Sequence, residues 1–142
     1  MSDISIYLPV PVFVVIGFAL WAVFLVLLVG LARVGQVLSG KRKPNEFPAG
    51  ERHGGDMYWR MNRAHLNTVE NLPIVAAIIY GGVLMDVQGE MFNQVCLIIL
   101  GARVVQSLIH IASGSVIAVN LRFAAYLVQI VCLIQLVVLY VK

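Results

Sequence analysis

The chain has 142 residues, of which 61% are hydrophobic and only 12% are charged. An ordinary soluble domain carries about twice that charged fraction, so the composition excludes a cytosolic globular protein. The net charge of +3 does not indicate nucleic-acid binding, because the basic residues crowd one segment without interleaved aromatic residues.

The first predicted element is a membrane-spanning helix at about 8–38. No Asp, Glu, Lys or Arg occurs from Ile4 to Ala32, and this stretch is long enough to cross about 30 Å of hydrocarbon as a helix. No basic residue precedes the apolar run, which is also too long for the core of a signal peptide. We therefore expect the mature protein to keep this helix.

A polar segment at about 39–61 follows and is predicted to be a loop, because it contains prolines and paired glycines. Three more membrane-spanning helices are predicted at about 62–87, 89–112 and 115–141. The expected fold is an all-α integral membrane protein, a four-helix bundle that forms a single domain over 1–142. Cys96 and Cys132 fall within the apolar runs and are interpreted as buried thiols that act as small hydrophobes.

The distribution of basic residues predicts the orientation. Seven of the ten Lys and Arg residues lie between Arg33 and Arg63, whereas the connection around Asp86 and Glu90 has none. The positive-inside rule then places the long loop in the cytoplasm and both termini on the opposite side. The polar residues within the helices cluster near the cytoplasmic ends, so we expect a site there.

Arg63, Asn67 and Glu70 form a polar stripe on the second helix. Their i, i+4 and i+7 spacing stacks them on a single helix face. The hydrocarbon of a membrane offers no hydrogen-bond partner to a charged or amide side chain, so the stripe must face protein or a water-filled cleft. The structural alternative is pairing: Arg103 on the third helix lies at a similar depth, and an ion pair between Arg103 and Glu70 is predicted because an intramembrane arginine needs a partner.

Arg122 and Tyr126 place a cation and a phenol on one face at the start of the fourth helix. This arrangement outlines an anion site, although an interfacial arginine and an aromatic-belt tyrosine give the same pattern. His53, His65 and His110 have no metal-ligand spacing, and no metal is assigned. The Gly81-Gly82 pair is interpreted as a helix-packing feature.

The segment 60–73 reads Arg-Met-Asn-Arg-Ala-His-Leu-Asn-Thr-Val-Glu-Asn-Leu-Pro. It resembles the second-helix signature of the MAPEG superfamily, the membrane-associated proteins in eicosanoid and glutathione metabolism. This residue pattern is similar to that of microsomal glutathione transferases and prostaglandin E synthases. Gly101-Ala102-Arg103-Val104 and the Arg122, Tyr126 pair resemble that superfamily's third and fourth helices, so the resemblance covers essentially the whole chain.

This resemblance implies a homotrimer that binds reduced glutathione, as its cofactor, at each subunit interface near the cytoplasmic side. Arg63, Asn67 and Glu70 would hold the carboxylates and amino group, and Arg33 would reach in from a neighbouring subunit. Arg122 and Tyr126 would be the catalytic residues nearest the sulfur. Arg122 would stabilise the thiolate, which is the nucleophilic form of a thiol.

Three positions depart from the eukaryotic pattern. Phe123 replaces the serine that follows the fourth-helix arginine in prostaglandin E synthase, so prostaglandin isomerisation is not expected. Gln106 stands where that synthase has histidine, and His110 where the eukaryotic synthases have tyrosine. Both exchanges retain hydrogen-bonding capacity, and both residues stay candidates for contact with glutathione.

The sequence thus predicts a membrane glutathione transferase that activates the thiolate for attack on a hydrophobic small-molecule or lipid electrophile, or that reduces a lipid hydroperoxide. Two alternatives differ in class. One is a non-catalytic scaffold or lipid-binding adaptor with the same fold. The other is a small transporter, which is disfavoured because the intramembrane charges gather at one leaflet. The short, loop-poor chain suggests a bacterial inner membrane.

Overall fold

The computed structural model describes residues 8–48 and 50–141, and within these ranges it contains four α-helices and no strand. The helices are α1 (Val10–Leu38), α2 (Asp56–Leu84), α3 (Glu90–Ala112) and α4 (Val116–Tyr140). Each of them is long and apolar enough to cross a membrane. The predicted all-helical, four-span architecture is confirmed.

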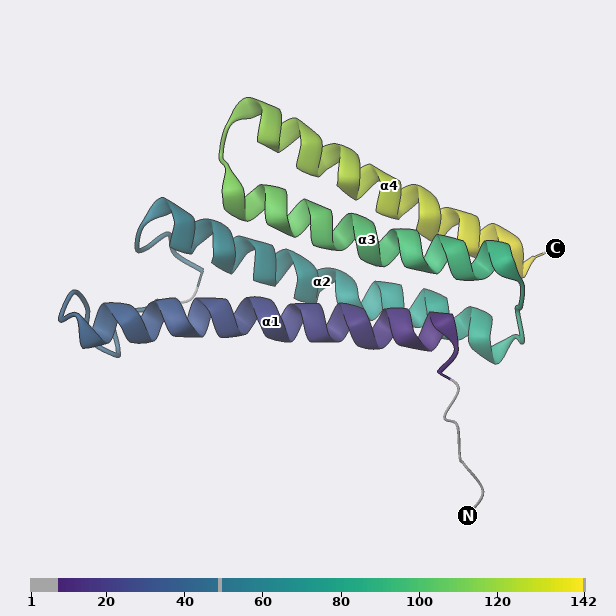
Figure 1. Cartoon of the computed structure of the whole chain (residues 1–142), viewed down its shortest axis with the longest axis horizontal. Helices are drawn as coiled ribbons and strands as arrows, with labels where there is room; N and C mark the ends of the chain where they lie inside the picture. The colour runs from purple at the N-terminus through teal and green to yellow at the C-terminus, as the bar shows by residue number, and fades with distance from the viewer. Residues whose placement is uncertain (1–7, 49, 142) are drawn as a thin grey trace, which may run out of the picture.

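The four helices alternate in direction along the bundle (Figure 1). The end of α1, the beginning of α2, the end of α3 and the beginning of α4 share one end of the bundle, which we call the loop end. The other end, where α1 begins and α4 finishes, is called the terminal end. The backbone of α1 lies close to α2 and α3 but not to α4, so α1 and α4 flank the bundle on opposite sides (Figure 1).

Helix lengths explain the shape of the loop end. Both α1 and α2 have 29 residues, whereas α3 has 23 and α4 has 25. At 1.5 Å per residue, α1 and α2 are each about 43 Å long, which is well beyond the thickness of the hydrocarbon. The excess lies at the loop end, where α1 and α2 extend past α3 and α4 (Figure 1).

The bounds of α2 differ from the predicted 62–87. The helix begins six residues earlier, at Asp56, because Gly55 is extended and the Asp56 carboxylate favours the positive end of the helix dipole. The polar composition of this turn favoured a loop in the sequence analysis, although the turn is helical. The helix ends at Leu84, since Asp86 has a positive φ of 56° that an α-helix does not accommodate.

The apolar core occupies the half of the bundle nearest the terminal end. All four helices contribute buried side chains to it, including Phe18, Ile79, Cys96, Ile99 and Leu136. Both cysteines are free and buried. Gly82 allows a close approach here, because a Cβ added to it would lie 2.7 Å from Tyr140 Cε1 and 2.9 Å from Phe92 Cζ. By contrast, a Cβ on Gly81 would have no heavy atom within 4 Å.

Candidate functional site

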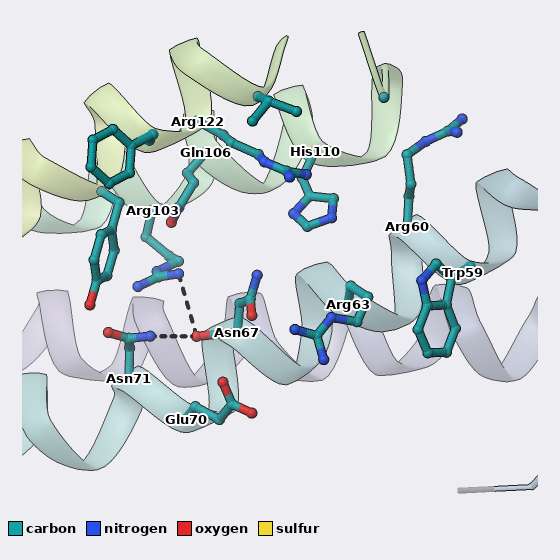
Figure 2. Close-up of a pocket in the computed structure, with 14 residues that line it drawn as sticks. Trp59, Arg60, Arg63, Asn67, Glu70, Asn71, Arg103, Gln106, His110 and Arg122 are labelled. Carbon is teal, nitrogen blue, oxygen red and sulfur yellow. Dashed lines mark hydrogen bonds between the residues drawn. The ribbon is translucent and has the colours of Figure 1, made fainter. Parts of the chain in front are cut away.

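A cavity of about 620 Å³ lies between α2, α3 and α4 in the half of the bundle nearest the loop end. Figure 2 shows the α2 side chains facing those of α3 and α4 across it. The lining residues are Trp59, Arg60, Arg63, Asn67, Glu70, Asn71, Arg103, Gln106, His110, Gly114, Val119, Arg122, Phe123 and Tyr126.

Seven of the eight site residues predicted from the sequence line this one cavity. They are Arg63, Asn67, Glu70, Gln106, His110, Arg122 and Tyr126. Their convergence follows from the alternating helix directions, which bring the start of α2 beside the end of α3 and the start of α4. Helical spacing of three or four residues then turns each set toward the same space.

Arg33 is the predicted residue that does not line the cavity of its own subunit. Its Nε donates a hydrogen bond to the hydroxyl of Tyr58 at 2.7 Å, and its guanidinium lies 5.5 Å from the centre of the Phe47 ring. The contact with a neighbouring subunit that the resemblance implies for Arg33 stays a prediction.

Arg103 is the most deeply buried member of the cavity wall, with only 1% of its surface exposed. Its Nη1 donates a 3.4 Å hydrogen bond to the carbonyl oxygen of Asn67, as Figure 2 shows. Its guanidinium also lies 5.4 Å from the centre of the Phe18 ring. Its Nε is buried and has no hydrogen-bond partner among the residues that the structure describes.

The predicted ion pair between Arg103 and Glu70 is wrong. Over residues 8–48 and 50–141, the only ion pair is that of Arg52 with Asp56. Helical rise placed the two residues at a similar depth but said nothing about direction. Arg103 is buried between helices, whereas Glu70 is on an exposed face of α2.

A buried amide pair sets the orientation of Gln106. Gln129, which is 1% exposed, donates from Nε2 both to the carbonyl of Ala125 at 3.2 Å and to Gln106 Oε1 at 3.1 Å. Because a backbone carbonyl only accepts hydrogen bonds, the amide nitrogen of Gln129 must lie on this side. Gln106 therefore turns its oxygen toward Gln129, and its side chain also lines the cavity.

Several residues of the cavity wall were not predicted from the sequence, although the same helical periodicity locates them. Arg60 precedes Arg63 by three positions and Asn71 follows Asn67 by four, so both continue the α2 stripe. Arg60 also links the start of α2 to the end of α3, because its Nε donates a 3.0 Å hydrogen bond to the carbonyl oxygen of Ile111. Gln129 gave no comparable signal, because a lone glutamine on an apolar helix shows its partner only in three dimensions.

The charge in the cavity is strongly unbalanced. Four arginines line it, at positions 60, 63, 103 and 122, against the single carboxylate of Glu70. In the described ranges none of these five groups forms an ion pair within the subunit. Charges at membrane depth are costly unless they are compensated, so the cavity is electrostatically suited to an anion.

Comparison with protein families supports the assignment that the second-helix motif suggested. The sequence matches the MAPEG family over residues 11–142, which is nearly the whole chain. The search of curated proteins found no match. Because the family match covers α2, α3, α4, all but the first residue of α1 and every residue of the cavity wall, the chain belongs to the MAPEG family.

Proposed function

We propose that this protein is a membrane-bound glutathione transferase whose active site is the cavity at the loop end. The observation that carries the proposal is the set of four arginines and one glutamate around a single polar space of about 620 Å³. MAPEG membership agrees with it, because that family's name covers glutathione metabolism.

Reduced glutathione matches these side chains in charge. It carries two carboxylates and one ammonium group, so its site needs more cations than anions together with one carboxylate. In this proposal Arg63 binds a carboxylate and Glu70 binds the ammonium group. The buried, unpartnered Nε of Arg103 provides a further donor whose desolvation a bound anion would compensate.

Arg122 and Tyr126 provide the groups that activate the sulfur. A thiol with a pKa of about 8.5 is only a few per cent ionised at neutral pH, and lowering that pKa by about two units makes the thiolate the major form. Arg122 supplies the positive charge beside the sulfur, and the hydroxyl of Tyr126 donates a hydrogen bond from one turn further along α4. His110 and the N–H groups of Gln106 hold the peptide.

The second substrate enters from the bilayer. Val119 and Phe123 give the cavity an apolar side on α4, and Phe123 is also 59% exposed on the helix surface. The thiolate attacks an electrophilic carbon, forming a carbon–sulfur bond as the leaving group departs with its electron pair. With a lipid hydroperoxide, two thiols are oxidised to a disulfide, and the peroxide is reduced to an alcohol and water.

Assembly and orientation belong to the same proposal. The protein forms a homotrimer, with its loop end and site toward the cytoplasm. Exposed apolar side chains on every helix provide surface for lipid and for neighbouring subunits. Native mass spectrometry in detergent tests the assembly, and a monomer that binds glutathione normally would contradict a site at the subunit interface.

The thiolate difference absorbance in the ultraviolet tests the activity. Glutathione is titrated into detergent-purified protein at neutral pH, with wild type compared with Arg122→Ala. We expect a saturable thiolate signal in wild type and none in the variant. Arg52→Ala is the matched control and should leave the signal unchanged, since Arg52 lies in the loop and pairs with the exposed Asp56 at the start of α2.

The same titration separates the enzyme from a non-catalytic adaptor. If glutathione raises the melting temperature of the wild type and is ionised there, the protein activates it. If there is neither thiolate nor thermal protection, the protein is instead a scaffold or lipid-binding member of its family.

A further inference from the structure

A buried chain of hydrogen bonds holds Arg33 at the loop end, outside the wall of the arginine-lined cavity. Arg33 Nε donates to the hydroxyl of Tyr58 at 2.7 Å, and this hydroxyl lies 3.2 Å from His53 Nε2. His53 Nδ1 in turn lies 2.8 Å from the carbonyl oxygen of Glu51. Only 4% of Tyr58 and 9% of His53 are exposed. The chain therefore joins α1, the loop and α2 at one point.

The donors and acceptors of this chain all run in one direction. A backbone carbonyl only accepts hydrogen bonds, so His53 Nδ1 carries the proton that it donates to Glu51. In the neutral ring Nε2 is then an acceptor, and the hydroxyl of Tyr58 donates to it. The phenol oxygen keeps its lone pairs for the Nε–H of Arg33. Each of these polar atoms thus has a partner, as buried polar groups require.

Ring contacts restrict the same side chains further. The centre of the Phe47 ring lies 5.9 Å from that of His53 and 6.4 Å from that of Tyr58. The Arg33 guanidinium lies 5.5 Å from the centre of Phe47. Gly54 brings the loop close to α2, because its φ is 73° and an added Cβ would lie 2.8 Å from Tyr58 Cδ1. These contacts leave Arg33 few of the rotamers that a free arginine adopts.

The guanidinium of Arg33 keeps one edge for a ligand. Its Nε bonds to Tyr58, and the ring of Phe47 lies beside it. In the part of the chain that the structure describes, Arg33 forms no ion pair. It is partly exposed and lines two grooves on the α1 side of the bundle, of about 390 Å³ and about 290 Å³. Nη1 and Nη2 therefore remain to donate to an anion that lies outside the subunit.

We propose that Tyr58 and His53 are positioning residues, which hold Arg33 in the direction of glutathione bound to a neighbouring subunit. This inference rests on the proposed function and on the homotrimer that belongs to it. Arg33 does not line the cavity of its own subunit, so its contact with glutathione must cross the interface. An arginine that is already ordered loses less conformational entropy when it binds a carboxylate.

Tyr58→Phe tests the inference, because it removes the hydroxyl and keeps the ring. Calorimetric titration should show that the Kd for glutathione rises about three- to tenfold. The kcat at saturating glutathione should stay at the wild-type value, because Arg122 and Tyr126 are unchanged. Tyr80→Phe is the matched control. Tyr80 lies on the same helix, is 39% exposed and does not line the cavity, so its loss of a hydroxyl should leave the Kd unchanged.

A double-mutant cycle shows whether Tyr58 acts through Arg33. Arg33→Ala should raise the Kd for glutathione more than Tyr58→Phe does. In the Arg33→Ala background, Tyr58→Phe should cause no further rise, because the side chain that it positions is gone. His53→Phe keeps a ring beside Phe47 but removes the acceptor of the Tyr58 hydroxyl, so it should raise the Kd by a smaller factor.

Three results would overturn the inference and leave the transferase proposal standing. A wild-type Kd in Tyr58→Phe would show that the hydroxyl does not position Arg33. Additive effects in the cycle would show that Tyr58 acts on the fold and not through Arg33. An unchanged Kd in Arg33→Ala would remove the contact itself. By contrast, a wild-type protein that neither binds glutathione nor gives a thiolate signal would overturn both proposals.

Discussion

The two halves of this bundle differ in what the helices place between them: apolar side chains in one half and a polar cavity in the other. Near the terminal end, the helices pack apolar side chains such as Phe18, Ile79 and Leu136 into a core. Near the loop end α2, α3 and α4 line a cavity with charged and amide side chains, and its buried arginine pairs with no carboxylate in the described ranges. Dispersion contacts in one half stabilise the fold, while the other half retains unsatisfied polar groups that a ligand can use.

The largest expected effect is on turnover in the polar half. Arg122→Ala should lower kcat by about 10²- to 10³-fold, the loss typical of removing one preorganised group at a developing charge. Glutathione affinity should fall much less, because Arg63 and Glu70 remain. Steady-state conjugation of a hydrophobic electrophile gives both constants, and an unchanged kcat would remove Arg122 from catalysis.

Glu70→Gln tests whether this carboxylate contributes to glutathione binding, to the stability of the fold, or to both. Because Glu70 is exposed and not paired with Arg103, the variant should fold normally. Its glutathione affinity should fall by about tenfold or more, since hydrogen bonds to charged groups contribute about 1.5–3 kcal/mol. Calorimetric titration and thermal unfolding separate the two quantities. A lowered melting temperature would show that this carboxylate also stabilises the fold.

Arg103→Met should reverse the usual consequence of altering a buried residue. Removing this cation leaves no carboxylate unpaired and removes an orphaned Nε, so the melting temperature should stay the same or rise. Glutathione affinity should fall about tenfold with the loss of one charge-assisted contact. A strongly destabilised variant would show instead that Arg103 belongs to the structural half.

Gly82→Ala addresses the apolar half and should lower the free energy of unfolding by about 1–3 kcal/mol. Its Cβ would meet both Tyr140 and Phe92, whereas Gly81→Ala is the matched control with open space around its Cβ. Denaturation in mixed detergent measures the difference. Equal effects of the two substitutions would contradict the close approach at Gly82.

The smallest expected effect is that of Gln129→Leu. Without the Gln129 amide, Gln106 is free to rotate and no longer presents its N–H groups in a fixed direction. The KM for glutathione should rise by a few-fold while kcat stays unchanged, and a parallel loss in Gln106→Leu should not add to it. Full additivity of the two substitutions would show that the residues act separately.

By itself the sequence determined the membrane class, the four helices and the composition of the polar stripe. These features depend on local quantities: long apolar runs define spans, and spacing of three or four residues defines a helix face. Arg63, Asn67 and Glu70 could therefore be predicted together. Arg122 and Tyr126 could be added because alternating spans place their helix start beside that stripe.

Tertiary structure alone decided which polar groups meet. It turned Arg103 toward Phe18 and the Asn67 carbonyl instead of toward Glu70, and it joined Gln129 to Gln106. It also separated Arg33 from the cavity and placed it with Arg42 on Phe47. The physical reason is that sequence spacing fixes the depth and the relative angle of side chains within one helix. The rotation of each helix about its own axis is set only by packing against its neighbours.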